Sequence, residues 1–300
     1  MSLAGGDLTT PARLAVWLAS PPTLPSNILN QLIGSMSDLI YGKLDRARTF
    51  SQTFTRTLDA TGTYQILLPD YPVTSIASVQ LGARIINPSQ LPPPGQAPAP
   101  NFGYGYRFVP WTGDLPGNPA VLEFVNGVWS YGAQNVKVTY NAGYLIQNEP
   151  ATVPNATPWQ VTVQQPKGLW CKDGGVTYAN GTPLTPVAST PTTGEYIPPP
   201  DTSPGLYTFA AGDANAQVLI SYSFIPASLE EAVCQMVAER YAYRGRVGEI
   251  SKSLGGQETI RYNWGDTAYA YRKYSGLPPQ VMDLIAPYMN VIPPAIGAPV

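Results

Sequence analysis

The clearest helix in the sequence lies late in the chain, between Pro226 and Ser253. Ser228 and Glu231 have the S-x-x-E spacing of a capping box, in which each side chain satisfies a backbone donor at a helix start. Gly245 lies where a left-handed C-cap is expected. The apolar residues of this helix recur at helical spacing and form one stripe: Leu229, Ala232, Val233, Met236, Val237 and Tyr241.

Two further helices are expected near the N-terminus. A short one begins at Pro11, because proline is tolerated in a first helical turn. A longer one begins at Ser26 and is expected to end at Gly42. Neither is long enough to be stable alone, so we expect both to pack on the late helix. The apolar face of the longer helix contains Ile28, Leu29, Leu32, Ile33, Met36, Leu39 and Ile40.

The middle of the chain changes to a period of two, which is typical of strands. We expect residues 49–58 and 63–68 to form a hairpin and residues 73–81 to form a further strand. More strands are expected at 84–86, 120–125 and 135–140. Residues 87–119 contain the run LPPPGQAPAP, which favours an exposed polyproline II loop.

The pattern of residues 136–140 (VKVTY) returns in residues 218–222 (VLISY), which lead into the late helix. Residues 145–225 are therefore interpreted as an inserted β module. The predicted fold class is α+β, with a small helical bundle formed by the N- and C-terminal helices. An antiparallel β-hairpin and β-sheet region and an inserted β domain lie between them. The predicted domains are 1–48 with 226–300 (helical core), 49–144 (β region with loop 87–119) and 145–225 (insert).

Composition argues against an enzyme. The chain has no histidine, which removes the commonest general base and the commonest metal ligand. Its two cysteines, Cys171 and Cys234, are too few for a zinc site built on cysteine. No nucleophile elbow or phosphate-loop motif is present. We therefore predict no catalytic residues, no cofactor and no metal.

Charge and hydropathy also limit the partners. A net charge of -2 leaves no strong electrostatic footprint for nucleic acid or for an anionic membrane. The start MSLAGGDLTT lacks the features of a signal peptide, and no apolar run of about 18 residues could span a membrane. The expected product is soluble and is made in the cytoplasm.

Aromatic and acidic residues leave an alternative open. Phe102, Tyr104, Tyr106, Phe108 and Trp111 would suit a sugar-stacking platform, but such residues more often cover a β core or an oligomer interface. No pair of acids is singled out for glycoside hydrolysis, because Asp173, Glu195, Asp201 and Asp213 lie in separate predicted turns.

Four motifs follow one another in a familiar order. They are LPDYPVTSIASVQL at 68–81, VKVTYNAGY at 136–144, YRGRVGEISKS at 243–253 and PYMN at 287–290. In this order the chain resembles the head–tail connector (adaptor) proteins of tailed bacteriophages. The resemblance covers about 1–86, 134–144 and 226–292, and the loop 87–119 and module 145–225 are extra to it.

The resemblance implies a structural virion protein located in the neck, at the head–tail interface, and assembled in the host bacterial cytoplasm. It implies a dodecameric ring that binds the portal protein on one side and a stopper or tail-terminator protein on the other. Double-stranded DNA would pass through its channel without sequence-specific binding, and no membrane is involved. The alternative is a carbohydrate-binding or other neck or baseplate protein that acts through the β insert, with Trp111 or Trp159 in contact with sugar.

Contact residues are expected in the loop 245–262 and in the tail 288–300, which is rich in proline and apolar residues. The candidate interface residues for subunit or portal contacts are Arg244, Arg246, Glu249, Lys252, Tyr288, Ile292 and Ile296.

Overall fold

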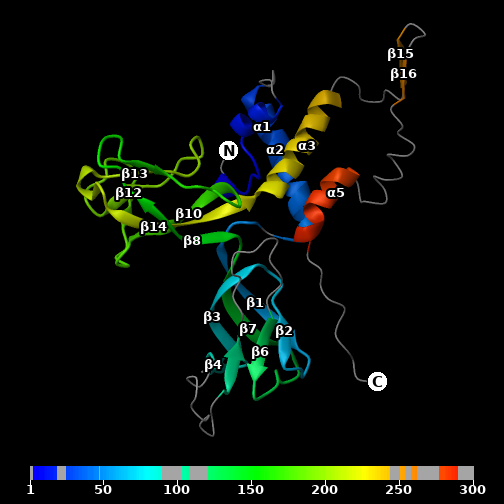
Figure 1. Ribbon diagram of the computed structural model, residues 1–300. Helices are drawn as coiled ribbons and strands as arrows, with labels where there is room; N and C mark the ends of the chain where they lie inside the picture. Colours follow the sequence, from blue (N-terminus) through cyan, green and yellow to red (C-terminus); the bar gives the residue numbers. More distant parts are fainter. Residues whose placement is uncertain are drawn as a thin grey trace. The chain divides into compact units, whose positions relative to one another are not determined.

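The computed structural model describes residues 3–18, 25–46, 48–89, 103–108, 121–243, 251–254, 258–261 and 277–289 (Figure 1). The chain divides into two compact units. Unit 1 contains Met1–Ala47, Gln165–Leu169 and Ile225–Val300, and unit 2 contains Arg48–Gln164 and Trp170–Phe224.

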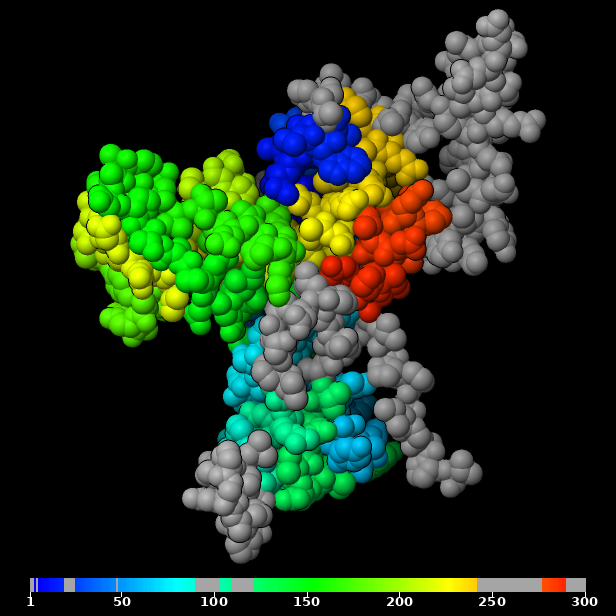
Figure 2. Space-filling model, viewed as in Figure 1, coloured from blue at the N-terminus to red at the C-terminus, as the bar shows by residue number. Residues whose placement is uncertain are grey.

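Unit 1 holds the helices. Near the N-terminus are η1 (Leu3–Gly5), α1 (Pro11–Trp17) and α2 (Ser26–Leu44), and late in the chain are α3 (Ala227–Tyr243), α5 (Pro279–Ile285) and η3 (Ala286–Tyr288). Helix α2 contacts both α1 and α3, and α5 contacts α3. Figure 2 shows the dark blue N-terminal residues and the red α5 on either side of the yellow α3. The unit also contains the antiparallel pair β15 (Ser251–Leu254) and β16 (Glu258–Arg261).

The helix boundaries have local causes. The Thr10 side chain caps α1 by accepting a hydrogen bond from the Arg13 backbone N–H at 3.4 Å, and Pro11 fills the first turn. Helix α2 ends at Leu44, and its C-cap Asp45 adopts a left-handed conformation with φ 51°. The predicted stop at Gly42 is therefore wrong. Two further residues are helical, and the second of them, Leu44, is buried at 0% exposure, so its packing stabilises the extra residues of the helix.

The first part of unit 2 consists of two antiparallel sheets. One has the order β1 (Gln52–Ala60), β7 (Gly132–Ala142), β3 (Val73–Leu81) and β4 (Arg84–Ile86). The other has the order β2 (Gln65–Leu67), β6 (Val121–Val125) and β5 (Gly105–Arg107). A single buried cluster includes Val79, Val138 and Tyr140 of one sheet, Leu122 of the other and Trp129 from the connection between β6 and β7.

The second part of unit 2 is also built from strands. One sheet has the order β10 (Gly168–Tyr178), β14 (Gln217–Pro226) and β8 (Leu145–Thr152). The other has the order β11 (Thr185–Pro186), β12 (Glu195–Ile197), β13 (Leu206–Phe209) and β9 (Gln160–Thr162). The short helix η2 (Ala211–Asp213) follows β13 in the chain. Large aromatic side chains are fully buried here, including Tyr196, Tyr207, Phe209, Tyr222 and Phe224.

The predicted fold class is wrong. Strands account for 40% and helices for 26% of the described residues, so the protein is mostly β rather than a helical bundle formed by its terminal helices. The late helix gives a long, regular signal in the sequence, whereas each short strand gives a weak one. The prediction therefore underestimated how much of the fold is formed by the short strands between residues 145 and 226.

The predicted hairpin of residues 49–68 is also wrong. Strand β1 pairs with β7, with Phe54 opposite Tyr140, while β2 pairs with β6, with Ile66 opposite Leu122. The two segments lie in different sheets because each buries its apolar residues against a partner distant in sequence. A turn between two strands does not by itself fix their pairing.

Candidate functional site: a buried polar network and the predicted contact segments

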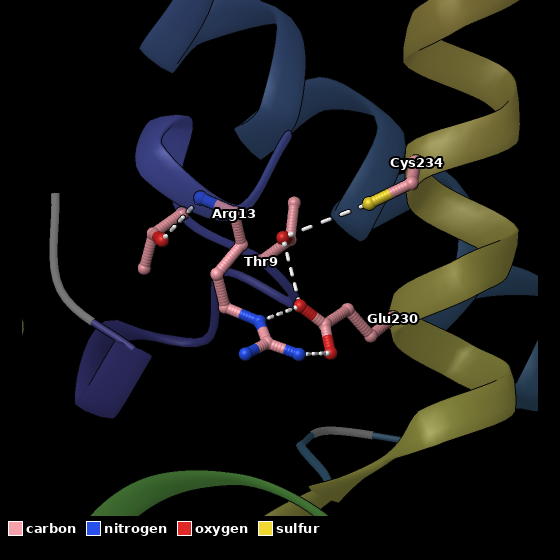
Figure 3. A network of polar contacts seen from close by, with 5 residues as sticks. Thr9, Arg13, Glu230 and Cys234 are labelled. Carbon is pink, nitrogen blue, oxygen red and sulfur yellow. Dashed lines mark hydrogen bonds and ion pairs between the residues drawn. The ribbon is translucent and has the colours of Figure 1, made fainter. Parts of the chain in front are cut away.

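The densest polar network in unit 1 centres on Glu230, a residue of the first turn of α3 that is 7% exposed (Figure 3). Arg13 of α1 donates from Nε to Oε1 and from Nη2 to Oε2, the second bond at 2.8 Å. Thr9 donates from its hydroxyl to Oε1 at 3.2 Å, and the Cys234 thiol donates to the Thr9 hydroxyl at 3.7 Å. The Glu230 carboxylate therefore accepts hydrogen bonds from Arg13 and Thr9, and the Thr9 hydroxyl in turn accepts one from Cys234.

The electrostatics of the network favour a structural role. Hydrogen bonding to Glu230 and attraction to its charge raise the pKa of Arg13, so the guanidinium stays charged. Burial raises the pKa of the Cys234 thiol to about 11, so it is protonated at neutral pH. A protonated thiol is a weak donor and a poor nucleophile. The network therefore joins chain segments and offers no reactive group.

Sequence reasoning missed this network. Glu230 lies off the apolar stripe of the late helix, and no contact was predicted for it, for Thr9 or for Arg13. Arg13 and Glu230 are 217 positions apart, so no local pattern connects them. The one signal available was the helix start at Thr10 and Pro11, which places Arg13 in the first turn of α1.

The predicted interface residues are mostly not described by the structure. Five of them lie outside the described residues, namely Arg244, Arg246, Glu249, Ile292 and Ile296. Lys252 lies in β15, opposite Ile260 of β16. Tyr288 lies in η3 and is 6% exposed, so most of its surface is already covered within the chain. The structure places these last two residues in separate elements.

Among the described residues of unit 2, four carboxylates accept hydrogen bonds from tyrosine hydroxyls. Asp173 accepts from Tyr196 at 2.7 Å and from Tyr207 at 3.0 Å, and the Tyr207 oxygen accepts from the Trp170 indole at 3.2 Å. Burial is the main cause of the raised pKa of Tyr196 and Tyr207, and the neighbouring Asp173 adds to it. Both phenols therefore remain neutral donors.

The other three carboxylates follow the same pattern. Asp213, 2% exposed, accepts from the Tyr178 hydroxyl at 2.5 Å and from the Gly194 backbone N–H at 3.2 Å. The remaining two bonds are Tyr222 to Glu149 and Tyr140 to Asp70, each at 2.6 Å. Of the four acids considered for glycoside hydrolysis, Asp173 thus holds two tyrosines in place and Asp213 holds one.

The described members of the aromatic cluster do not form a stacking platform. Tyr106 is 8% exposed and belongs to the buried cluster, and Phe108 packs against that cluster. Tyr104 is 43% exposed, with its ring 5.2 Å from that of Phe124 and with Arg84 5.0 Å from its centre. Phe102 and Trp111 lie outside the described residues. Tyr106 and Phe108 thus belong to or cover a β core, which was the alternative to a sugar-stacking platform.

Within the described ranges, no group of three or more histidine, cysteine, aspartate or glutamate residues has an arrangement that could hold a metal ion. A search of the same ranges finds no helix that is both long enough and apolar enough to cross a membrane. Both cysteines are buried and unpaired with each other. The sequence of the chain matches no model of a known protein family and no curated protein.

Proposed function

We propose that this protein is a structural virion protein, a head–tail adaptor that forms a ring beneath the portal of a tailed bacteriophage. The ring extends the DNA channel and provides the platform on which a stopper or tail-terminator protein docks. Its subunits act by assembly, and double-stranded DNA passes through without sequence-specific contacts. The site of action is the virion neck, and assembly takes place in the host bacterial cytoplasm.

One observation carries the proposal: the segments that resemble adaptors at the two ends of the chain meet in unit 1. Helices α2 and α3 contact each other. The ion pair of Arg13 and Glu230 links α1 to α3. In the sequence these elements are separated by the whole β region. Long β segments therefore separate, in the sequence, helices that contact each other in the fold. This arrangement suits a subunit whose β segments contact neighbouring subunits in an assembly.

The chemistry of the described residues supports an assembly role. Buried carboxylates are engaged by arginine, threonine or tyrosine donors. The Cys171 thiol is buried, and burial raises its pKa. These groups stabilise the fold and leave little for catalysis, which accords with a protein that works through its surface.

Electron microscopy of the purified protein with and without portal rings tests the proposal. We expect an added ring of density with the symmetry of the adaptor on one face of the portal, twelvefold if the ring is dodecameric. Portal rings that stay bare at saturating protein would contradict it. Specific binding on a glycan array that is lost in Trp159→Ala would instead favour the carbohydrate-binding alternative.

A further inference from the structure

Helix α2 has two apolar faces rather than one. Its first face is buried in unit 1 and includes Leu29, Ile33, Met36 and Ile40. Beside it runs a second line of residues separated by four, three, four and three positions, which is the spacing of a helix-packing seam. Ile28 and Leu39 on this line are 45% and 37% exposed. We call this line the α2 seam, and its members are Ile28, Leu32, Ser35, Leu39 and Gly42.

The composition of α2 is unusual for a helix that faces water on this side. A surface helix normally carries charged residues opposite its buried face. Among the 19 residues of α2, only Asp38 and Lys43 are charged, and neither belongs to the seam. The surface of the seam is therefore neutral and mostly apolar.

Gly42 adds an independent observation. It lies in the last turn of α2, two residues before the helix ends at Leu44, and a Cβ built on it would meet nothing within 4 Å. Glycine inside a helix is less stable than alanine there, so an open position gives no local reason for it. Ser35 and Gly42 instead lower the surface of the seam, which allows another apolar group to approach the helix closely.

A matching group is found at the end of α1. Val16 is 82% exposed and Trp17 is 47% exposed, and both are neutral. We call this pair the α1 knob. Tryptophan is among the residues that most often anchor protein interfaces, because it buries a large area at a small cost in side-chain entropy.

We propose that the α1 knob of one subunit docks on the α2 seam of a second copy of this chain. The large Val16 and Trp17 side chains suit the low surface at Ser35 and Gly42, and neither patch carries a charge that would oppose the contact. Each chain supplies one knob and one seam, so a second copy is the partner that covers both in equal number. Within α2, a nucleic acid would find the attractive Lys43 and the repulsive Asp38 beside the seam.

This inference rests on the proposed function and deepens it. When the knob of each copy docks on the next copy and its seam receives the knob of the preceding one, the contact is heterologous, and it closes into a ring when the rotation allows. A two-fold dimer would instead pair the knobs and seams of the same two copies reciprocally and would leave no route to a ring. Knob-to-seam docking therefore assigns residues to the subunit contact of the proposed ring.

Sedimentation velocity of the full-length protein over a range of concentrations tests the contact. The variants are Trp17→Lys on the knob, Leu39→Glu on the seam and the double variant. Asn27→Glu is the matched control, because it adds the same charge to an exposed position of α2 that lies off the seam. We expect each single variant to weaken self-association about 10-fold or more, the control to behave as wild type, and the double variant to recover part of the loss through the new ion pair.

Circular dichroism and urea unfolding check that each variant folds, and Trp17→Ser and Leu39→Ser replace any charged variant that does not. Single variants that associate as strongly as wild type would overturn the inference, and so would a wild type that stays monomeric throughout. Electron microscopy with portal rings separates the two proposals. Rings on the portal formed equally well by Leu39→Glu would reject the knob-to-seam contact and leave the adaptor function standing.

Discussion

Among single residues, Glu230 shows how a charge is kept inside unit 1. A buried carboxylate is costly unless charged and neutral donors surround it. Here Arg13 supplies a two-point ion pair, and the Thr9 hydroxyl donates a further bond. Glu230 also lies in the first turn of α3, where the helix dipole favours a negative charge. Three independent effects thus stabilise one ionised side chain.

Removing one member of the Arg13–Glu230 pair should destabilise unit 1. We expect Glu230→Gln to lower the free energy of unfolding by about 2 kcal/mol. The half-exposed Arg13 can recover some hydration, so the loss stays below that of a fully buried pair. Arg13→Ala should cost more, because it leaves a buried carboxylate with a single hydroxyl donor. Urea unfolding followed by far-ultraviolet circular dichroism measures both.

The matched control is Glu231→Gln, one position further along α3. Glu231 is exposed and accepts a hydrogen bond from Gln235 on the same helix. Its loss should change stability little. Equal effects at positions 230 and 231 would mean that the ion pair with Arg13 contributes nothing specific.

The raised pKa of Tyr178 predicts that unit 2 becomes less stable at alkaline pH. Burial and the neighbouring Asp213 raise its pKa to about 12, because both disfavour a phenolate. The folded state therefore binds this proton more tightly than the unfolded chain, whose tyrosines titrate near pH 10. The resulting stability is complete below pH 10 and is lost as the pH rises toward 12. Tyr140, Tyr196 and Tyr207 act in the same direction.

The test compares urea midpoints at pH 9, 10 and 11 for wild type, Tyr178→Phe and Tyr131→Phe. Wild type should lose stability across this range, and Tyr178→Phe should lose less because one of the shifted phenols is gone. Tyr131 is 87% exposed, so its variant should follow wild type. A Tyr178→Phe curve parallel to wild type would argue against the shift.

At the scale of elements, periodicity predicted single elements well and pairings poorly. Strand β3 has the bounds that alternation predicted, and α3 begins one residue before the expected cap Ser228. The partners of β1 and β2 were wrong, because partner choice depends on apolar contacts between distant segments. The tyrosine–carboxylate bonds and the Arg13–Glu230 pair were missed for the same reason. Each joins residues whose proximity only the folded chain creates.

Gly143, which follows β7, illustrates a backbone requirement that the motif VKVTYNAGY contains. Its φ is +132°, and a Cβ there would lie 2.4 Å from the Phe50 carbonyl oxygen. We expect Gly143→Ala to destabilise unit 2 by roughly 3 kcal/mol, because it adds a backbone clash to an unfavourable φ. Gly175→Ala is the control, since φ there is +105° but nothing lies within 4 Å of the added carbon.

The comparison of these two glycines separates strain from clash. Gly175→Ala should cost about 1–2 kcal/mol, which is the conformational part alone. Thermal unfolding of both variants beside wild type gives the two values. If Gly143→Ala proved no worse than Gly175→Ala, the close approach to Phe50 would not matter for stability.

For the whole molecule, the clear helical pattern of α3 led to a prediction with too much helix and too little strand. The described residues are mostly β, yet the contacting helices of unit 1 come from both ends of the chain. Closing such contacts requires the intervening β segments to fold or be looped out at an entropic cost. In the proposed ring, contacts between subunits would offset the cost of ordering the remaining loops.

The C-terminal tail supplies the last prediction. Its sequence after Asn290 is VIPPAIGAPV, which is apolar, uncharged and rich in proline. Such a segment favours an extended conformation and loses little entropy when it binds a partner. Deleting residues 290–300 should leave far-ultraviolet circular dichroism and the melting temperature unchanged, because α5, η3 and the η3 cap Met289 stay intact. It should weaken co-sedimentation with portal rings about 10-fold, the effect of losing a small set of buried apolar anchors. A tail of equal length made of serine and glycine controls for length alone and should bind as weakly as the deletion. Undiminished co-sedimentation of the truncated protein would place the portal contact elsewhere on the subunit.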